Sequence, residues 1–248
     1  MTKILEICVD NLESFINALN GGANRIELCS ALGEGGLTPS VGFLKQVQAL
    51  NTKKIPIYCM IRCRRGFDFN YTPEEMSIMI EDAKLLKQNG ADGFVFGALT
   101  KELQINTKQC REIIKTCYPQ PVTFHRAFDV CKNPLVTLEA VIDVGFERIL
   151  TSGQKLNALD GAENIKTYIE KANGRIIIMA GCGVNVNNVS KILSITGVKE
   201  VHGSASSFRD IDNTDNNKNE VYLNDQALNV TEQSKVEQLI KIIQDNEV

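Results

Sequence analysis

The chain has 248 residues, of which 43% are hydrophobic and 23% are charged, and its formal net charge is −3. This length and composition fit one large α/β domain with a sizeable core, and the small net charge does not indicate the clustered basic face of a nucleic-acid-binding protein. No apolar stretch approaches the roughly 18 residues of a membrane-spanning helix, and Glu6 and Asp10 interrupt the first apolar run, so we expect neither a membrane protein nor a signal peptide.

Short β-branched runs alternate with amphipathic stretches along the chain, which is typical of a repeating strand and helix unit. The expected strands are residues 4–10, 25–30, 55–62, 93–99, 122–129, 148–152, 175–180 and 200–205. The expected helices are residues 12–19, 40–50, 73–88, 107–117, 134–144, 161–172, 186–195 and 231–245. The helix start at Thr72 is the clearest, because Pro73, Glu74 and Glu75 follow this capping residue in the first turn.

Eight units of this kind predict parallel strands joined by right-handed crossovers, and eight such strands close into a TIM-type (β/α)8 barrel of the α/β class. We expect a single domain over residues 1–248, with a long polar surface loop at about residues 206–230 before the last helix. The alternative is an open doubly wound sheet. It is disfavoured because no GxGxxG sequence opens the first helix.

The chain contains eight cysteines and no CxxC pair, so neither a zinc ribbon nor a thioredoxin-type motif is present. Without a signal peptide we expect a cytoplasmic protein, with presence in the nucleus left open, and there most cysteines are free thiols. The first two expected strands repeat the pattern Glu-x-Cys at Glu6 and Cys8 and at Glu27 and Cys29. Residues two apart on a strand share a face, so this pattern can place two carboxylates and two thiols in the barrel lumen.

Further polar residues gather at the ends of the expected strands, where barrels of this type build their sites. They are Arg62, His125, Arg126, Asp129, Gly181, Gly183, His202, Gly203 and Ser204. Both histidines of the chain are in this set. The carboxyl end of the barrel is therefore where we expect function to lie.

Several ordered segments resemble the CutC copper homeostasis family. They are ELCS at 27–30, EGGLTPS at 34–40, MIR at 60–62, DGFVFGAL at 92–99, TFHRAFD at 123–129 and RILTSG at 148–153. The resemblance covers residues 4 to about 210 and implies a TIM-type barrel, a cytoplasmic location, a homo-oligomer and a role in handling copper. The chain departs from the family pattern in three places. Cys63 stands in place of a proline and Arg65-Gly66-Phe67 precedes Asp68, Ala180-Gly181-Cys182-Gly183 stands where the family has Pro-Gly-Gly-Gly, and the last loop is individual to this chain.

Two thiols on neighbouring strands are suited to bind Cu(I), because this soft ion prefers thiolate ligands. Adjacent strands lie about 4.8 Å apart, so Cys8 and Cys29 can reach one ion between them. The alternative is that both are small buried hydrophobic side chains, as free cysteines often are. The first hypothesis is therefore a copper homeostasis protein that binds Cu(I) through Cys8 and Cys29.

A TIM-barrel enzyme acting on a small anionic substrate, phosphorylated or not, is the second hypothesis. Its catalytic residues would be Glu27, Arg62, His125, Arg126 and Asp129, because buried charges are costly unless they are paired or used. An ion-pair network that merely closes the barrel is the alternative for this set, and a scaffold with a disused pocket is a third hypothesis.

Glycine-rich turns follow the last two expected strands, where many barrels bind a phosphate group through backbone N–H groups. Gly181, Gly183, Gly203 and Ser204 would form that site. The alternative is a pair of tight turns without a ligand. The expected partners are thus a copper ion and a small anionic ligand, with no nucleic acid and no membrane.

Overall fold

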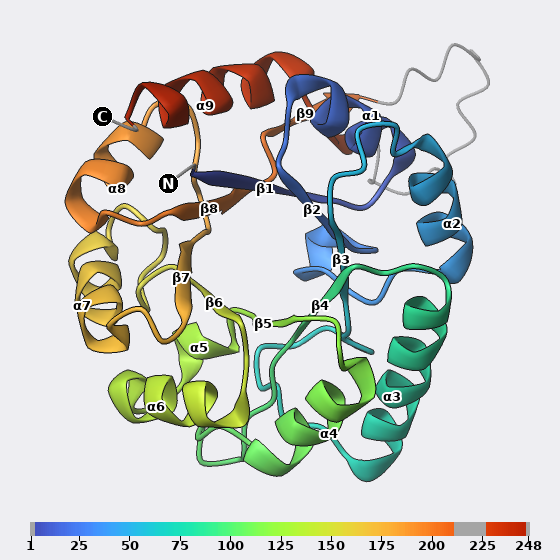
Figure 1. The fold of residues 1–248 in the computed structure, drawn as a ribbon, viewed down its shortest axis with the longest axis vertical. Helices are drawn as coiled ribbons and strands as arrows, with labels where there is room; N and C mark the ends of the chain where they lie inside the picture. The colour runs from blue at the N-terminus through green and yellow to red at the C-terminus, as the bar shows by residue number, and fades with distance from the viewer. Residues whose placement is uncertain (1–2, 211–226, 247–248) are drawn as a thin grey trace, which may run out of the picture.

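Figure 1 shows a closed barrel with helices around its outside, in a computed structural model that describes residues 3–210 and 227–246. The eight barrel strands follow one another in chain order, neighbouring strands are parallel, and the eighth pairs with the first. The strands are β1 (Ile4–Val9), β2 (Arg25–Leu28), β3 (Ile57–Met60), β4 (Gly93–Phe96), β5 (Val122–Phe124), β6 (Arg148–Thr151), β7 (Ile177–Ala180) and β8 (Glu200–Gly203). The predicted TIM-type barrel is confirmed.

Helices cover the outer face of the barrel between successive strands (Figure 1). They are α1 (Leu12–Gly21), α2 (Val41–Leu50), α3 (Pro73–Gln88), α4 (Thr107–Cys117), α5 (Ala127–Val130), α6 (Pro134–Val144), α7 (Ala162–Ala172), α8 (Val189–Thr196) and α9 (Gln233–Asp245), with a short 3-10 helix η1 (Leu32–Glu34). Across the described parts of the chain, no helix combines the length and the apolar character that crossing a membrane requires.

The start of α3 shows how local sequence sets these elements. The Thr72 hydroxyl accepts from the Glu75 N–H at 3.2 Å, and the Glu75 carboxylate accepts from the Thr72 N–H at 2.8 Å. These two bonds satisfy N–H groups that have no partner inside the helix, and Pro73 needs none. Buried residues then recur three or four positions apart, at Met76, Met79, Ala83 and Leu86. That spacing gives α3 one apolar face, which packs in the core between helices and barrel.

The strand that leads into His125 is shorter than the sequence predicts. β5 ends at Phe124 instead of continuing through residues 122–129, and Ala127–Val130 forms helix α5. The carbonyl of His125 accepts from the N–H of Phe128 at 3.1 Å, and these local bonds turn the chain directly after the strand. A short run without a sustained period of two cannot be assigned to strand or short helix from sequence alone, which explains the difference.

Both ends of the loop expected at about residues 206–230 are strands instead. Strand β9 (Ser206–Asp210) pairs antiparallel with β10 (Ala227–Thr231), and residues 211–226 between them lie outside the described part of the chain. The Thr231 N–H donates to the Ser14 hydroxyl at 3.0 Å, which anchors β10 beside α1. Polar composition concealed this pairing, because it depends on partners distant in the sequence.

The register of the barrel decides which side chains share a level of the lumen. Glu6 of β1 lies opposite Arg25 of β2 and opposite His202 of β8, and Cys8 lies opposite Glu27. Side chains two apart on a strand point to the same face. The register therefore brings charged residues from the first, second and last strands together inside the barrel.

Candidate functional site

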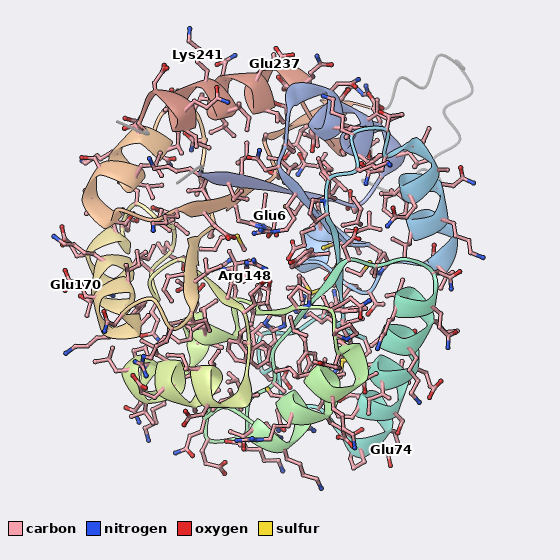
Figure 2. All side chains as sticks on the ribbon, viewed as in Figure 1. Glu6, Glu74, Arg148, Glu170, Glu237 and Lys241 are labelled. Atoms are coloured by element: carbon pink, nitrogen blue, oxygen red, sulfur yellow. The ribbon has the colours of Figure 1, made fainter. Side chains whose placement is uncertain are left out.

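The amino-terminal half of the barrel lumen holds a network of buried charges. Arg25 donates to Glu6 and to Glu200, and Arg148 Nε donates to Glu200 Oε2 at 3.1 Å. Figure 2 shows Glu6 and Arg148 near the barrel centre, while Glu74 lies on the outer rim. We call Glu6, Arg25, Arg148 and Glu200 the lumenal ion network. Lumens of this fold are usually filled by apolar layers, so this one is unusual.

Glu6 stays ionised in this network. Burial alone would raise the pKa of its carboxyl, but the charge of Arg25 and a hydrogen bond with His202 hold that pKa well below its ordinary value. Arg25 remains a cation because Glu6 and Glu200 outweigh the effect of its burial. Glu6 and Arg25 therefore both remain charged in the lumen beneath the carboxyl ends of the strands.

One layer further along the strands lie Cys8, Glu27 and His202, which we call the Cys-Glu-His cluster. Within the described residues, these three offer one sulfur, one carboxylate oxygen and one ring nitrogen within 4.8 Å of one another. His202 Nδ1 lies 2.8 Å from Glu6 Oε1, and His202 Nε2 lies 3.6 Å from Glu27 Oε2. All three residues of the cluster are buried, so few other groups compete for their ligand atoms.

His202 is charged in the folded protein. Burial alone would lower the pKa of this imidazole, but Glu27, Cys8 and Glu6 together raise it well above its ordinary value. Burial in turn raises the pKa of Glu27, although the charge of His202 opposes that effect. A metal ion bound here would take the place of the histidine proton, because ring nitrogens bind metals only when deprotonated.

Cys29 lies beside the cluster. Its Sγ is 3.7 Å from Glu27 Oε2, and its side chain is buried with Tyr58 and Met60. Burial and then the charge of Glu27 raise the pKa of this thiol well above its ordinary value, so it is protonated in the absence of a metal. The two thiols predicted from the Glu-x-Cys repeat thus both lie inside the barrel, near the carboxyl ends of β1 and β2.

His202 was not among the metal ligands predicted from sequence. Only the closure of the barrel between β1 and β8 brings it to Cys8, since the two positions are 194 residues apart in the sequence. The signal in the sequence was its position at the end of an expected strand, which indicated a site residue without indicating its neighbours.

A cavity of about 280 Å³ opens above the cluster at the carboxyl end of the barrel. Its lining comes from five of the eight strands and from the loops that follow five of the eight, and it includes Cys8, Glu27, Met60, Arg62, Phe67, Phe69, His125, Arg126, Leu150, Val184, His202, Gly203 and Ser204. Three buried polar atoms on this lining have no hydrogen-bond partner among the described residues, namely Glu27 Oε1, Arg62 Nε and His125 Nε2. Unpartnered buried polar atoms are rare, and here they converge on one cavity.

Most of the Arg62 guanidinium holds the neighbouring loops together. It donates to the carbonyl oxygens of Glu34, Gly36 and Gly66 at 3.1, 3.0 and 2.6 Å. The side chain also lies over the ring of Phe69, with 5.4 Å between the guanidinium carbon and the ring centre. Nε is the nitrogen of this guanidinium that has no partner among the described residues, so Arg62 both holds the loops and offers a free donor at the cavity lining.

His125 is neutral, in contrast to His202. Burial, followed by the charges of Arg62 and Arg126, lowers the pKa of His125 to about 3. Its Nδ1 accepts from the N–H of Ala127 at 3.1 Å, at the start of α5. A neutral imidazole carries one hydrogen, so this bond places it on Nε2.

Asp129 does not share the cavity with the other predicted catalytic residues. Its carboxylate accepts from Arg126 Nε at 2.8 Å, from the Ser152 N–H at 3.0 Å and from the Thr151 hydroxyl. These bonds fix the loop after β6 against α5. The cavity lining therefore includes the predicted residues Glu27, Arg62, His125 and Arg126, whereas Asp129 braces the loop behind them.

Of the residues predicted to bind a phosphate group, some line the cavity and one does not. Gly183, Gly203 and Ser204 line the cavity, and Gly183 has a φ of +70°, a conformation that glycine adopts without strain. Gly181 is not on the lining. A Cβ there would lie 2.4 Å from Leu150 Cδ1, so its role is to let β7 pass close to its neighbour.

Comparison with known proteins gives consistent results. The sequence model of the CutC family matches residues 3–207. The human copper homeostasis protein cutC homolog is 49% identical over 207 residues, which is 84% of this chain and 75% of that protein, and the Caenorhabditis elegans homolog is 52% identical over 202 residues, or 82% and 80%. The crystal structure of CutC from Streptococcus agalactiae superposes with a TM-score of 0.78 at 35% identity, covering 82% of this chain and 99% of that one.

Proposed function

Because the chain belongs to the CutC family, several of whose members are named copper homeostasis proteins, we propose that it takes part in copper homeostasis by binding Cu(I) inside its barrel. The observation that supports a metal site is the Cys-Glu-His cluster, with its three ligand atoms within 4.8 Å of one another. We also expect a cytoplasmic homo-oligomer, as the family resemblance implies.

The donor set of the lumen suits copper better than the hard cations. A thiolate and an imidazole are ligands that copper accepts, whereas calcium and magnesium prefer oxygen atoms alone. Cys8 is the central ligand in this proposal, because it belongs to the cluster and lies on the strand next to Cys29. Cys29 and His202 are the candidates for the second ligand.

We expect the wild-type protein to take up about one Cu(I) in an anaerobic competition titration against a chromophoric chelator. A Cys8→Ser, Cys29→Ser double variant should bind this ion at least about tenfold more weakly, because serine offers no soft sulfur. The matched control is a Cys59→Ser, Cys117→Ser double variant, whose thiols are also fully buried neighbours but lie in the core outside the lumen. Equal copper binding by all three proteins would refute the proposal.

A His202→Gln variant tests how the ion is held. If Cu(I) lies between Cys8 and Cys29 alone, this variant should keep nearly full affinity. If the imidazole is a ligand, the affinity should fall by roughly 10- to 100-fold while the stoichiometry stays the same.

A second function is supported by the three unpartnered atoms of the cavity. We propose that the cavity also binds a small anionic molecule, as an enzyme of this fold would at the same end of the barrel. Glu27, Arg62, His125 and Arg126 are the residues proposed to contact it, and the backbone at Gly183, Gly203 and Ser204 would take a phosphate group if the ligand carries one.

A further inference from the structure

We infer that one wall of the cavity is a binding site for the carboxylate group of a small organic acid, with His125 Nε2–H and Arg62 Nε–H as its donors. We call His125, Arg62, Arg126 and Phe69 the His125 wall. The inference deepens the second proposed function and does not depend on copper.

The direction of the His125 hydrogen is the first step. Because Nδ1 accepts from the Ala127 N–H, the neutral ring must present Nε2 as a donor. No described residue accepts from that donor, although the side chain is only 3% exposed. Leaving such a group unpaired costs roughly 1–3 kcal/mol, so a bound oxygen atom in the cavity would remove a real penalty. Arg62 Nε presents a second donor of the same kind.

The charge of this wall selects an anion. Arg62 and Arg126 line the cavity together with His125 and both act electrostatically on it, so an oxygen that accepts from the imidazole would lie in the field of two positive charges. The imidazole itself stays neutral, which keeps it a fixed donor. Apolar side chains complete the lining at Met60, Leu150 and Val184. A small molecule with a charged oxygen group and a short carbon skeleton matches these surroundings.

A carboxylate fits this wall better than a phosphate. Three of the four other N–H donors of the Arg62 guanidinium are occupied by backbone carbonyls, and Arg126 is already paired with Asp129. Two single donors match the two oxygens of a carboxylate, whereas a phosphate has three oxygens and a larger charge to satisfy. Glu27 lies on the same lining with an unpartnered oxygen, which disfavours a dianion further.

Backbone strain at Phe69 supports a ligand at this wall. Its φ is +47°, in the left-handed region that residues with side chains rarely adopt. The Phe69 ring lies 4.8 Å from the His125 ring and 5.4 Å from the Arg62 guanidinium carbon, measured between centres. Strain of this kind persists mainly where a site needs it. Here it places the Phe69 ring against both the His125 ring and the Arg62 guanidinium.

The test is a ¹⁵N-histidine spectrum, which resolves easily because the chain has only two histidines. In a buffer free of carboxylates and phosphate, His125 should appear as the neutral ring with hydrogen on Nε2. Adding acetate or pyruvate should shift the Nε2 signal of His125 in a saturable manner. His125→Asn keeps an acceptor for the Ala127 N–H but removes the cavity donor, and it should weaken pyruvate binding about tenfold or more.

A matched pair of arginine variants gives the control. Arg126→Gln should weaken pyruvate binding, whereas Arg175→Gln, at an exposed arginine paired with Glu139 outside the lining, should not. If inorganic phosphate shifts His125 and the carboxylates do not, the carboxylate inference is wrong while anion binding stands. If none of the three shifts His125, both the inference and the second proposed function are wrong.

Discussion

Replacing Arg25 by methionine is expected to lower the free energy of unfolding by about 3–5 kcal/mol, the largest loss that we predict for a single side chain of the lumen. Arg25 is the only residue of the lumenal ion network that bridges both Glu6 and Glu200. Methionine fills a similar volume without the charge, so two buried carboxylates would lose their main partner. Urea denaturation of the purified wild-type and variant proteins measures the change.

Two further variants separate this effect from simple repacking. Arg175→Met removes an exposed arginine that is paired with Glu139, and it should cost no more than about 1 kcal/mol. Adding Glu6→Gln to Arg25→Met should restore part of the loss, because Glu6 has then lost its arginine, whereas Glu200 still pairs with Arg148. If Arg25→Met is as stable as the wild type, the network does not need its central cation.

The sequence was sufficient for the barrel because its evidence is repeated eight times. Each of the eight expected strands overlaps an observed barrel strand. A wrong boundary in one strand, as at β5, does not change the number of strand–helix units. The position of site residues at strand ends followed from the fold itself. Glu27, Arg62, His125 and Arg126 were therefore placed at the right end of the barrel without any knowledge of their contacts.

The contacts themselves could not be predicted, because they depend on neighbours that only the closed barrel supplies. Nothing in the sequence indicates that the Asp129 carboxylate accepts its hydrogen bonds from the loop after β6, or that Arg62 donates to three loop carbonyls. The two histidines looked alike as strand-end residues, yet one lies among carboxylates and the other between guanidinium groups. Their opposite charge states are a property of the assembled lumen.

Acid should destabilise the protein through His125. The pKa of this histidine is about 3 in the folded protein, against an ordinary value of 6.5. Between these two values the unfolded chain binds a proton that the folded protein does not, so the stability due to neutral His125 is present above about pH 6.5 and is lost as the pH falls. The loss amounts to roughly 1.4 kcal/mol per pH unit, or about 3 kcal/mol between pH 6.5 and pH 4.

Denaturation curves of wild type, His125→Asn and His202→Asn at several pH values isolate this contribution from the other groups that titrate in acid. The stability difference between wild type and His125→Asn should shrink as the pH falls from 6.5 to 4, because asparagine takes up no proton in either state. The difference between wild type and His202→Asn should not shrink in that range, because the raised pKa of His202 keeps it protonated in the folded protein, and the unfolded chain also protonates below the ordinary pKa of 6.5. If both differences shrink equally, His125 is not the buried neutral ring on which the carboxylate site depends.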